Sequence, residues 1–208
     1  MRLSLLILLL VLPLFSMGQR SHIGVLGGAI ASNFTSAPFF PQSEPILGTT
    51  VGFYYNRPVS AGLSLESGFS LAQKGARHDP GLFFYSPVPS SSRLSLSYLS
   101  LPVLARVRLS DQVSIHGGGY LATLIHSYYF STLKTTGETQ ESTNWDIIEQ
   151  NSAYARHDFG LQVGARCVFS EHLVVNASYD HGIGRPFSRV FNDGPRNRSV
   201  SMSVGYQW

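Results

Sequence analysis

The sequence predicts an all-β protein, an eight-stranded antiparallel up-and-down β-barrel that spans a membrane. Three observations predict it: few charged residues, an alternation of apolar and polar residues with a period of two, and short connections that alternate with long ones. Of the 208 residues, 43% are hydrophobic, 12% are aromatic and 13% are charged, about half of the charged content of ordinary soluble domains. Aromatic and β-branched residues are too plentiful for a disordered chain. A formal net charge of +3 without a basic run gives no sign of a nucleic-acid partner.

The N-terminal segment, residues 1–18, predicts a cleaved signal peptide. Arg2 precedes an apolar run over residues 5–15, and small residues follow before the expected cut at Gly18–Gln19. The apolar run is shorter than the roughly 20 residues that a membrane-spanning helix needs, although a retained anchor is the alternative. We therefore expect an exported protein whose mature part, residues 19–208, forms the barrel domain.

Eight segments of the mature chain alternate as β-strands do. In the sixth, Phe159, Leu161 and Val163 face away from Gly160 and Gln162. The fourth changes phase near its middle, since Leu94 and Leu96 are even whereas Leu99 and Leu101 are odd, and a β-bulge near Tyr98 is expected there. The expected strands are residues 20–31, 46–56, 60–72, 94–108, 112–127, 153–169, 172–181 and 198–208.

Short and long connections between these strands alternate without exception. The short ones are residues 57–59, 109–111 and 170–171, and the long ones are residues 32–45, 73–93, 128–152 and 182–197. Bacterial outer-membrane barrels combine short periplasmic turns with long external loops. An even strand number then places both chain ends on the periplasmic side. We expect the protein to lie in the bacterial cell outer membrane as a monomer. Its surroundings there, the outer-membrane lipid, are its first expected partner.

A soluble sandwich or a lipocalin is the alternative, because alternation alone does not say whether the apolar face points inward. The polar face is rich in Gly and Ser rather than in Lys and Glu, which suits a crowded interior. Aromatic residues also gather near the strand ends, as in the girdles of membrane barrels. The expected girdles are Phe53, Tyr54 and Tyr55 at one rim, and Tyr128, Tyr129 and Phe130 at the other.

Four strand motifs resemble those of the PorT-like outer-membrane β-barrel proteins. Residues 98–106, YLSLPVLAR, resemble the family's YLxIPxLxK strand, and residues 118–122, GGYLA, resemble its GxYxG strand. Residues 158–166 resemble DxGxxxGxG, and the ending at residues 200–208 resembles SLSLGYRF. The chain departs from these patterns by having Leu, Arg, Ala, Arg and Trp at positions 101, 106, 122, 166 and 208. The resemblance implies a small porin-like barrel in the outer membrane. The member that gave the family its name is linked to type IX secretion, so the resemblance also implies a secretion-related role as an alternative.

Charged residues on the inward face of the strands form the main candidate site. An eight-stranded barrel has an interior just wide enough for side chains, and buried charges must pair. We expect a structural network of ion pairs, with an ion or proton path as the alternative, and removing Arg106 should leave Glu66 or Asp158 without its partner. The inward charges are Glu66, Arg106, Arg108, Asp158, Arg166 and Asp180.

The sequence offers no catalytic, metal or cofactor site. His126 and Ser127 are adjacent, as are His157 and Asp158, and adjacent strand residues point to opposite faces. The single Cys167 excludes an internal disulfide and a metal site built on several cysteines. We therefore expect no enzyme and no cofactor, with a lipid-modifying enzyme as the remote alternative.

The expected function is a structural or interaction role through the long external loops, with an extracellular or envelope protein as the partner. A transport or secretion-accessory role is the alternative. During insertion we expect the barrel-assembly machinery to be a partner and to bind the C-terminal residues Tyr206 and Trp208.

Overall fold

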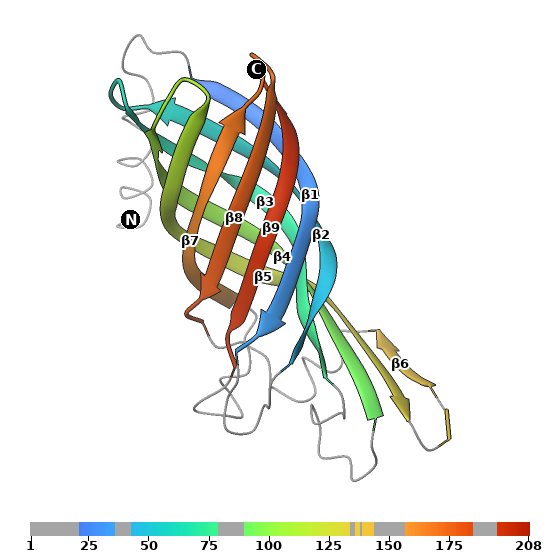
Figure 1. Ribbon diagram of the computed structural model, residues 1–208. Coiled ribbons are helices and arrows are strands. Elements are labelled where there is room, and N and C mark those ends of the chain that lie inside the picture. The colour runs from blue at the N-terminus through green and yellow to red at the C-terminus, as the bar shows by residue number, and fades with distance from the viewer. Residues whose placement is uncertain are drawn as a thin grey trace.

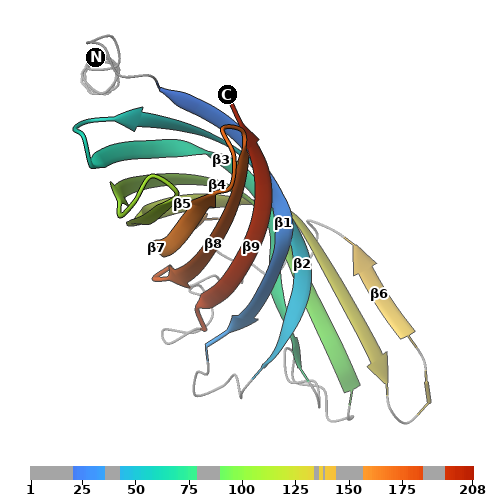
Figure 2. The same cartoon turned by 45° about the horizontal axis from the view of Figure 1, so that its top comes forward.

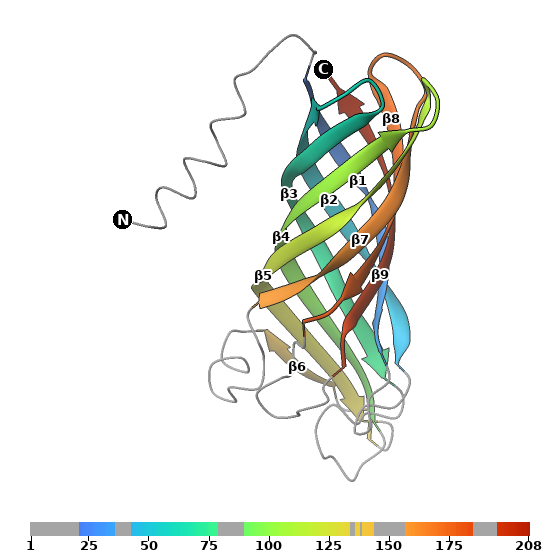
Figure 3. The same ribbon diagram turned by 90° about the vertical axis from the view of Figure 1, so that its left-hand side faces the viewer.

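The computed structural model of this chain describes residues 21–35, 43–78, 90–133, 136–137, 139–143, 157–184 and 195–208, and these form a tilted barrel of β-strands (Figures 1 and 3). No helix within this part of the chain is long and apolar enough to cross a membrane. The predicted signal peptide lies outside the described residues and stays a prediction. The strands are β1 (His22–Phe34), β2 (Glu44–Pro58), β3 (Leu63–His78), β4 (Ser90–Arg108), β5 (Val113–Leu133), β6 (Thr139–Thr143), β7 (His157–Val168), β8 (Leu173–Gly182) and β9 (Asn197–Gln207).

Eight of these strands close into the predicted barrel, and every neighbouring pair is antiparallel. The order around the barrel is β1-β2-β3-β4-β5-β7-β8-β9, and β9 pairs with β1 through partners such as Tyr206 and Val25. The first and last described residues lie at the end that carries the short turns (Figure 1). The fold class predicted from the sequence is therefore confirmed. We call this end periplasmic and the opposite end external, as in other outer-membrane barrels.

The three periplasmic turns share one construction. Each spans four residues, and in each the residue after the strand donates its backbone N–H to the carbonyl of the next strand's first residue: Val59 to Leu63, and Leu109 to Val113, at 2.8 and 2.9 Å. A serine follows in every turn, and the Ser110 hydroxyl accepts the Val113 N–H at 3.1 Å. Side-chain acceptors of this kind stabilise tight turns, so these local sequences set the register of the hairpins.

The phase change expected in β4 does not occur, and the irregularity lies in its partner β5. Even-numbered residues of β4 point inward throughout, since Leu96 and Leu104 are both buried. The pairing slips between Ser97 and Tyr98, where β5 contains one extra residue, Ile125. The register shift does lie beside Tyr98, but the bulge is in β5 and not in β4 as predicted, and Leu94 and Leu96 face inward.

Several strands continue past the barrel at its external end. β5 pairs with β7 up to Thr123, and from Tyr128 to Thr132 it pairs with the short β6 instead. The outer parts of β4 and β5 together with β6 form a projecting three-stranded ribbon, which we call the external extension (Figures 1 and 2). The prediction that residues 128–152 form only a loop is thus wrong for the part that pairs in this ribbon. Apolar and polar residues alternate only where a strand contacts lipid. The alternation therefore could not predict these polar strand segments outside the membrane.

The outer surface of the barrel carries a continuous set of apolar side chains. Leu101 and Val103 of β4 are 52% and 49% exposed, and their neighbours on the other strands are exposed to a similar degree. In water so large an apolar surface would aggregate, whereas in a bilayer it contacts hydrocarbon. Examples from other strands are Val51, Leu65, Phe69, Leu121, Leu161, Val163, Val200, Met202 and Val204.

We expect Leu101→Arg to destabilise the folded barrel by about 2–4 kcal/mol, because it places a charge in the hydrocarbon near the midplane. Leu109→Arg is the matched control. Leu109 is 61% exposed in a periplasmic turn, where the cost should fall to about 0–1 kcal/mol. Urea unfolding in lipid vesicles measures both free energies. Equal costs for the two variants would contradict the assignment of the outer face of β4.

Candidate functional site

The lumen holds the candidate site, and its periplasmic half is organised by one carboxylate between two guanidinium groups. Arg166 of β7 donates from Nη1 and Nη2 to the two carboxylate oxygens of Glu66 on β3, at 2.9 and 3.0 Å. Arg106 of β4 also donates to Glu66 Oε2. All three side chains are buried. We call this group the inner triad; it carries a formal charge of +1.

Polar and aromatic neighbours complete the inner triad. Asn176 accepts a hydrogen bond from Arg166 Nε at 3.2 Å, and the Arg166 guanidinium lies 3.9 Å from the centre of the Tyr54 ring. A guanidinium stacked on an aromatic face is a favourable cation–π contact. Tyr54 is only 4% exposed, so the prediction that it belongs to a rim girdle is wrong. Its even position on β2 puts it in the lumen, whereas Phe53 and Tyr55 face outward.

A second group of charges lies nearer the external end. Lys74 Nζ is 2.9 Å from Asp180 Oδ2 and 4.7 Å from the centre of the Tyr120 ring. Asp158 accepts hydrogen bonds at Oδ2 from the Tyr120 hydroxyl at 3.2 Å and from the Asn197 amide at 3.0 Å. Lys74 and Asp158 are almost fully buried. We call Lys74, Asp158 and Asp180 the outer group; it carries a formal charge of −1.

The structure brings five of the six predicted lumen charges into these two groups. Glu66, Arg106 and Arg166 form one, and Asp158 and Asp180 belong to the other. The prediction that Arg108 joins the buried network is wrong, because Arg108 is exposed at the periplasmic mouth. No ion pair within the described residues joins it to the buried charges.

Lys74 is the functional residue that sequence reasoning missed, and it supplies the third buried cation. The expected strand ended at residue 72, which placed Lys74 in a loop, whereas β3 continues to His78. The sequence does contain a signal for Lys74, which is its even residue number. Even-numbered residues of this strand face inward, as Glu66, Ser70 and Ala72 do.

An apolar cluster lies in the lumen beside the outer group and extends toward the external end. Leu94, Leu96 and Tyr98 of β4 lie against residues from three other strands, and each is at most 3% exposed. Because these side chains point inward from β1, β3, β4 and β5, they pack part of the external half of the lumen with hydrocarbon. We call it the apolar plug; its members are Phe34, Ala76, Leu94, Leu96, Tyr98, Tyr120, Ala122 and Leu124, with Tyr129 partly buried against them.

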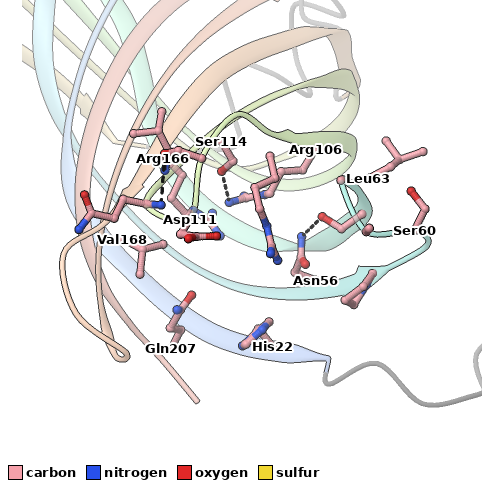
Figure 4. A pocket seen from close by; sticks show the side chains of 18 of the residues that line it. His22, Asn56, Ser60, Leu63, Arg106, Asp111, Ser114, Arg166, Val168 and Gln207 are labelled. Atoms are coloured by element: carbon pink, nitrogen blue, oxygen red, sulfur yellow. Dashed lines mark hydrogen bonds between the residues drawn. The ribbon is translucent and has the colours of Figure 1, made fainter.

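Two cavities lie on the periplasmic side of the apolar plug. The larger, of about 240 Å³, opens at the periplasmic mouth and is lined by Arg106, Arg108, Arg166 and Asp111 (Figure 4). The smaller, of about 80 Å³, lies deeper in the lumen between polar side chains such as Gln162. The inner triad separates the two cavities, since Arg166 lines both. Ligands from the periplasm therefore have access to the guanidinium groups.

Tyr206 and Trp208 lie at the periplasmic end of β9, and their role in assembly stays a prediction. Their rings meet edge to face with centroids 4.9 Å apart, and the His172 ring stacks on Tyr206 at 5.0 Å. Trp208 also donates its backbone N–H to Ile23 at 2.8 Å. The C-terminal residues thus combine an outward aromatic surface with the seam between β9 and β1.

The described residues hold no group of three His, Cys, Asp or Glu side chains that could bind a metal ion. The two adjacent pairs considered for catalysis point apart. His126 is exposed and Ser127 is buried, while His157 is exposed and Asp158 is buried.

A closed eight-stranded barrel with an apolar outer surface and a charged, packed lumen defines a small bacterial outer-membrane protein. The comparison with protein families agrees, because residues 15–188 match the model of the outer membrane protein beta-barrel domain. The chain belongs to this family, and it resides in the bacterial outer membrane. No curated protein matches the sequence.

Solved structures show the same fold at low sequence identity. Ail, the attachment invasion locus protein of Yersinia pestis, is similar with a TM-score of 0.51 and 13% identity, over 91% of this chain and 100% of that chain. A major outer membrane protein from Thermus thermophilus has a TM-score of 0.50 and 13% identity over the same shares. These likenesses concern the fold alone.

Proposed function

We propose that this protein is a non-enzymatic, monomeric outer-membrane barrel that binds an extracellular or envelope protein at its external end. The external extension is the observation that carries the proposal. Lipid requires strands only as long as the bilayer, yet β4 and β5 span 19 and 21 residues and β6 adds a further strand beside them. A paired ribbon outside the membrane costs conformational entropy that membrane anchoring does not require.

The contacts of the external extension support a rigid binding surface. Its inner side rests on the apolar plug through Tyr129, and Arg93 donates to the Leu47 carbonyl of β2 at 3.3 Å. The ribbon is also joined to the barrel wall by its backbone, because β4 pairs with β3 as far as Ser92 and His78. Preorganised surfaces bind with a smaller entropic cost than mobile loops do.

Site-specific photo-crosslinking in intact cells tests this proposal. A photoreactive side chain at Thr136, which is exposed in the connection between β5 and β6, should form a discrete adduct with one protein. The same group at Ser60, exposed in a periplasmic turn, is the matched control and should not form that adduct. The adduct should also disappear when Arg93→Ala loosens the ribbon. An adduct that forms equally from both positions, or no adduct from Thr136, would contradict binding at the external end.

A transport or secretion-accessory role, as implied by the resemblance to PorT-like proteins, is the second candidate. The 240 Å³ cavity that opens to the periplasm is the observation that favours it. Conductance in planar bilayers separates the two functions. We expect no stable channel, because the buried side chains of the inner triad, the outer group and the apolar plug occupy the lumen. Discrete conductance steps from purified barrel would favour transport.

A further inference from the structure

We infer that the periplasmic mouth of the lumen is a binding site for a small water-soluble oxyanion, a phosphate or carboxylate group held by Arg106, Arg108 and Arg166. The inference concerns the end of the barrel opposite to the external extension. It rests on the charge balance of this end, on the donors that line its cavity, and on the enclosure of that cavity by the strand ends.

The charge at this end of the lumen is not balanced. Three arginines line the mouth cavity and one carboxylate, Asp111, faces them. Glu66 does not line this cavity but lies deeper in the lumen, where it binds Arg106 and Arg166. The sum is a formal charge of +1, with His22 and His116 counted as neutral. Uncompensated charge in a partly dry site is costly, and a bound anion would neutralise it.

Hydrogen-bond donors around the cavity are left without partners. Arg106 is 8% exposed, and its Nε is buried with no hydrogen-bond partner in the described part of the chain. Its Nη1 reaches only the Ser114 hydroxyl at 3.4 Å, a long and weak contact (Figure 4). Guanidinium groups bind oxyanions through pairs of N–H donors and more weakly bind spherical ions. The weak contact of Nη1, rather than the buried Nε, therefore leaves Arg106 able to bind an oxyanion in the cavity.

The position of the cavity decides where the anion comes from. Its lining residues come from the inward faces and turns of the barrel, including Asn56, Ser64 and Gln112. Lipid headgroups lie outside this ring of strands, so a headgroup phosphate has no direct path to the arginines. A volume of about 240 Å³ accommodates an anion the size of phosphate together with a few waters. The ligand is thus a free anion that arrives from the periplasm.

Calorimetric titration of the folded full chain in neutral detergent with inorganic phosphate tests the inference, at an ionic strength held constant with chloride. We expect saturable binding. Arg108→Gln should weaken it by about 2- to 5-fold, the size of an exposed charge interaction. Asp111→Asn should strengthen it by a similar factor, because the only carboxylate among the described residues that line the cavity is then neutral. A cold-versus-boiled gel shift verifies that each variant is folded.

Arg77→Gln is the matched control, since Arg77 is an exposed arginine of β3 near the external end. It removes the same charge and should leave phosphate binding unchanged. Arg106→Lys keeps the charge but loses the paired donors, and should weaken binding by about tenfold. If that variant does not fold, the two exposed mouth variants still decide the question.

Three results would overturn the inference. The first is the absence of saturable binding to the wild-type chain. The second is an equal effect of Arg108→Gln and Arg77→Gln, or weaker binding after Asp111→Asn, because the site would then lie elsewhere. The third is displacement of phosphate by phosphatidylglycerol in nanodiscs, with phosphatidylcholine nanodiscs as the reference, which would identify a lipid headgroup as the source of the anion.

Discussion

Glu66→Gln is expected to lower the free energy of unfolding by about 3–5 kcal/mol, because it leaves two buried guanidinium groups without a counter-charge. Arg106 and Arg166 both bind this carboxylate, and after the substitution they also repel each other. Urea titration in lipid vesicles, followed by the gel shift of the folded barrel, measures the loss. Glu171→Gln, in an exposed periplasmic turn, is the matched control and should change stability by less than about 1 kcal/mol.

The structure also ranks the substitutions within the inner triad. The sequence predicted that loss of Arg106 leaves a carboxylate unpaired, but Glu66 keeps both of its hydrogen bonds to Arg166. Arg106→Met should therefore cost about 1.5–3 kcal/mol, the range of one hydrogen bond to a charged group. In the Glu66→Gln background the same change should restore stability, because it removes a repelling cation. If Arg106→Met is as harmful in that background as in the wild type, the two arginines are not coupled through Glu66.

Deletion of Tyr206–Trp208 should reduce assembly in the outer membrane severely. These residues pair with β1 and β8 at the periplasmic end, and Gln207 and Trp208 donate backbone hydrogen bonds to His172 and Ile23 at 2.8 Å each. An open seam in lipid exposes backbone groups that no water can satisfy. We also expect the barrel-assembly machinery to lose the aromatic terminus that it binds during insertion.

The yield of heat-modifiable protein in outer-membrane fractions measures this effect, together with sensitivity to periplasmic proteases. Trp208→Phe is the matched control, because it keeps an aromatic ring beside Tyr206 and leaves the backbone bond to Ile23 intact. This variant should assemble as the wild type does. Normal yield of the truncated chain would show that closure of the seam and recognition by the machinery do not depend on these three residues.

The membrane-facing surface was predictable because lipid imposes one rule on every strand. Residues such as Leu101 and Phe159 alternate with small or polar residues, and the structure exposes them on the outer face. The lengths of the connections added the strand order and the location of the chain ends. Both signals arise from local sequence, so they need no knowledge of side-chain contacts.

The interior was less predictable, because a lumen accepts both apolar and charged side chains. Leu94 and Leu96 resemble lipid-facing residues in every respect except position, yet they belong to the apolar plug. Tyr54 resembles a girdle aromatic, yet it stacks on Arg166 inside the barrel. Lys74 was missed because alternation fades where a strand leaves the membrane. Parity along a whole strand is the better guide to these residues than their chemical type.

The two charged layers have opposite net charges, and we expect this arrangement to oppose the passage of ions of both signs. A cation from the periplasm meets the positive inner triad first and is repelled there. An anion that passes this layer meets the negative outer group, whose free oxygens, Oδ1 of Asp158 and of Asp180, repel it in turn. The side chains of the apolar plug beside them are mostly hydrocarbon and offer few ligands to a dehydrated ion. We therefore expect water in the cavities to support no ion leak, because the two layers present opposed electric fields to an ion in the lumen.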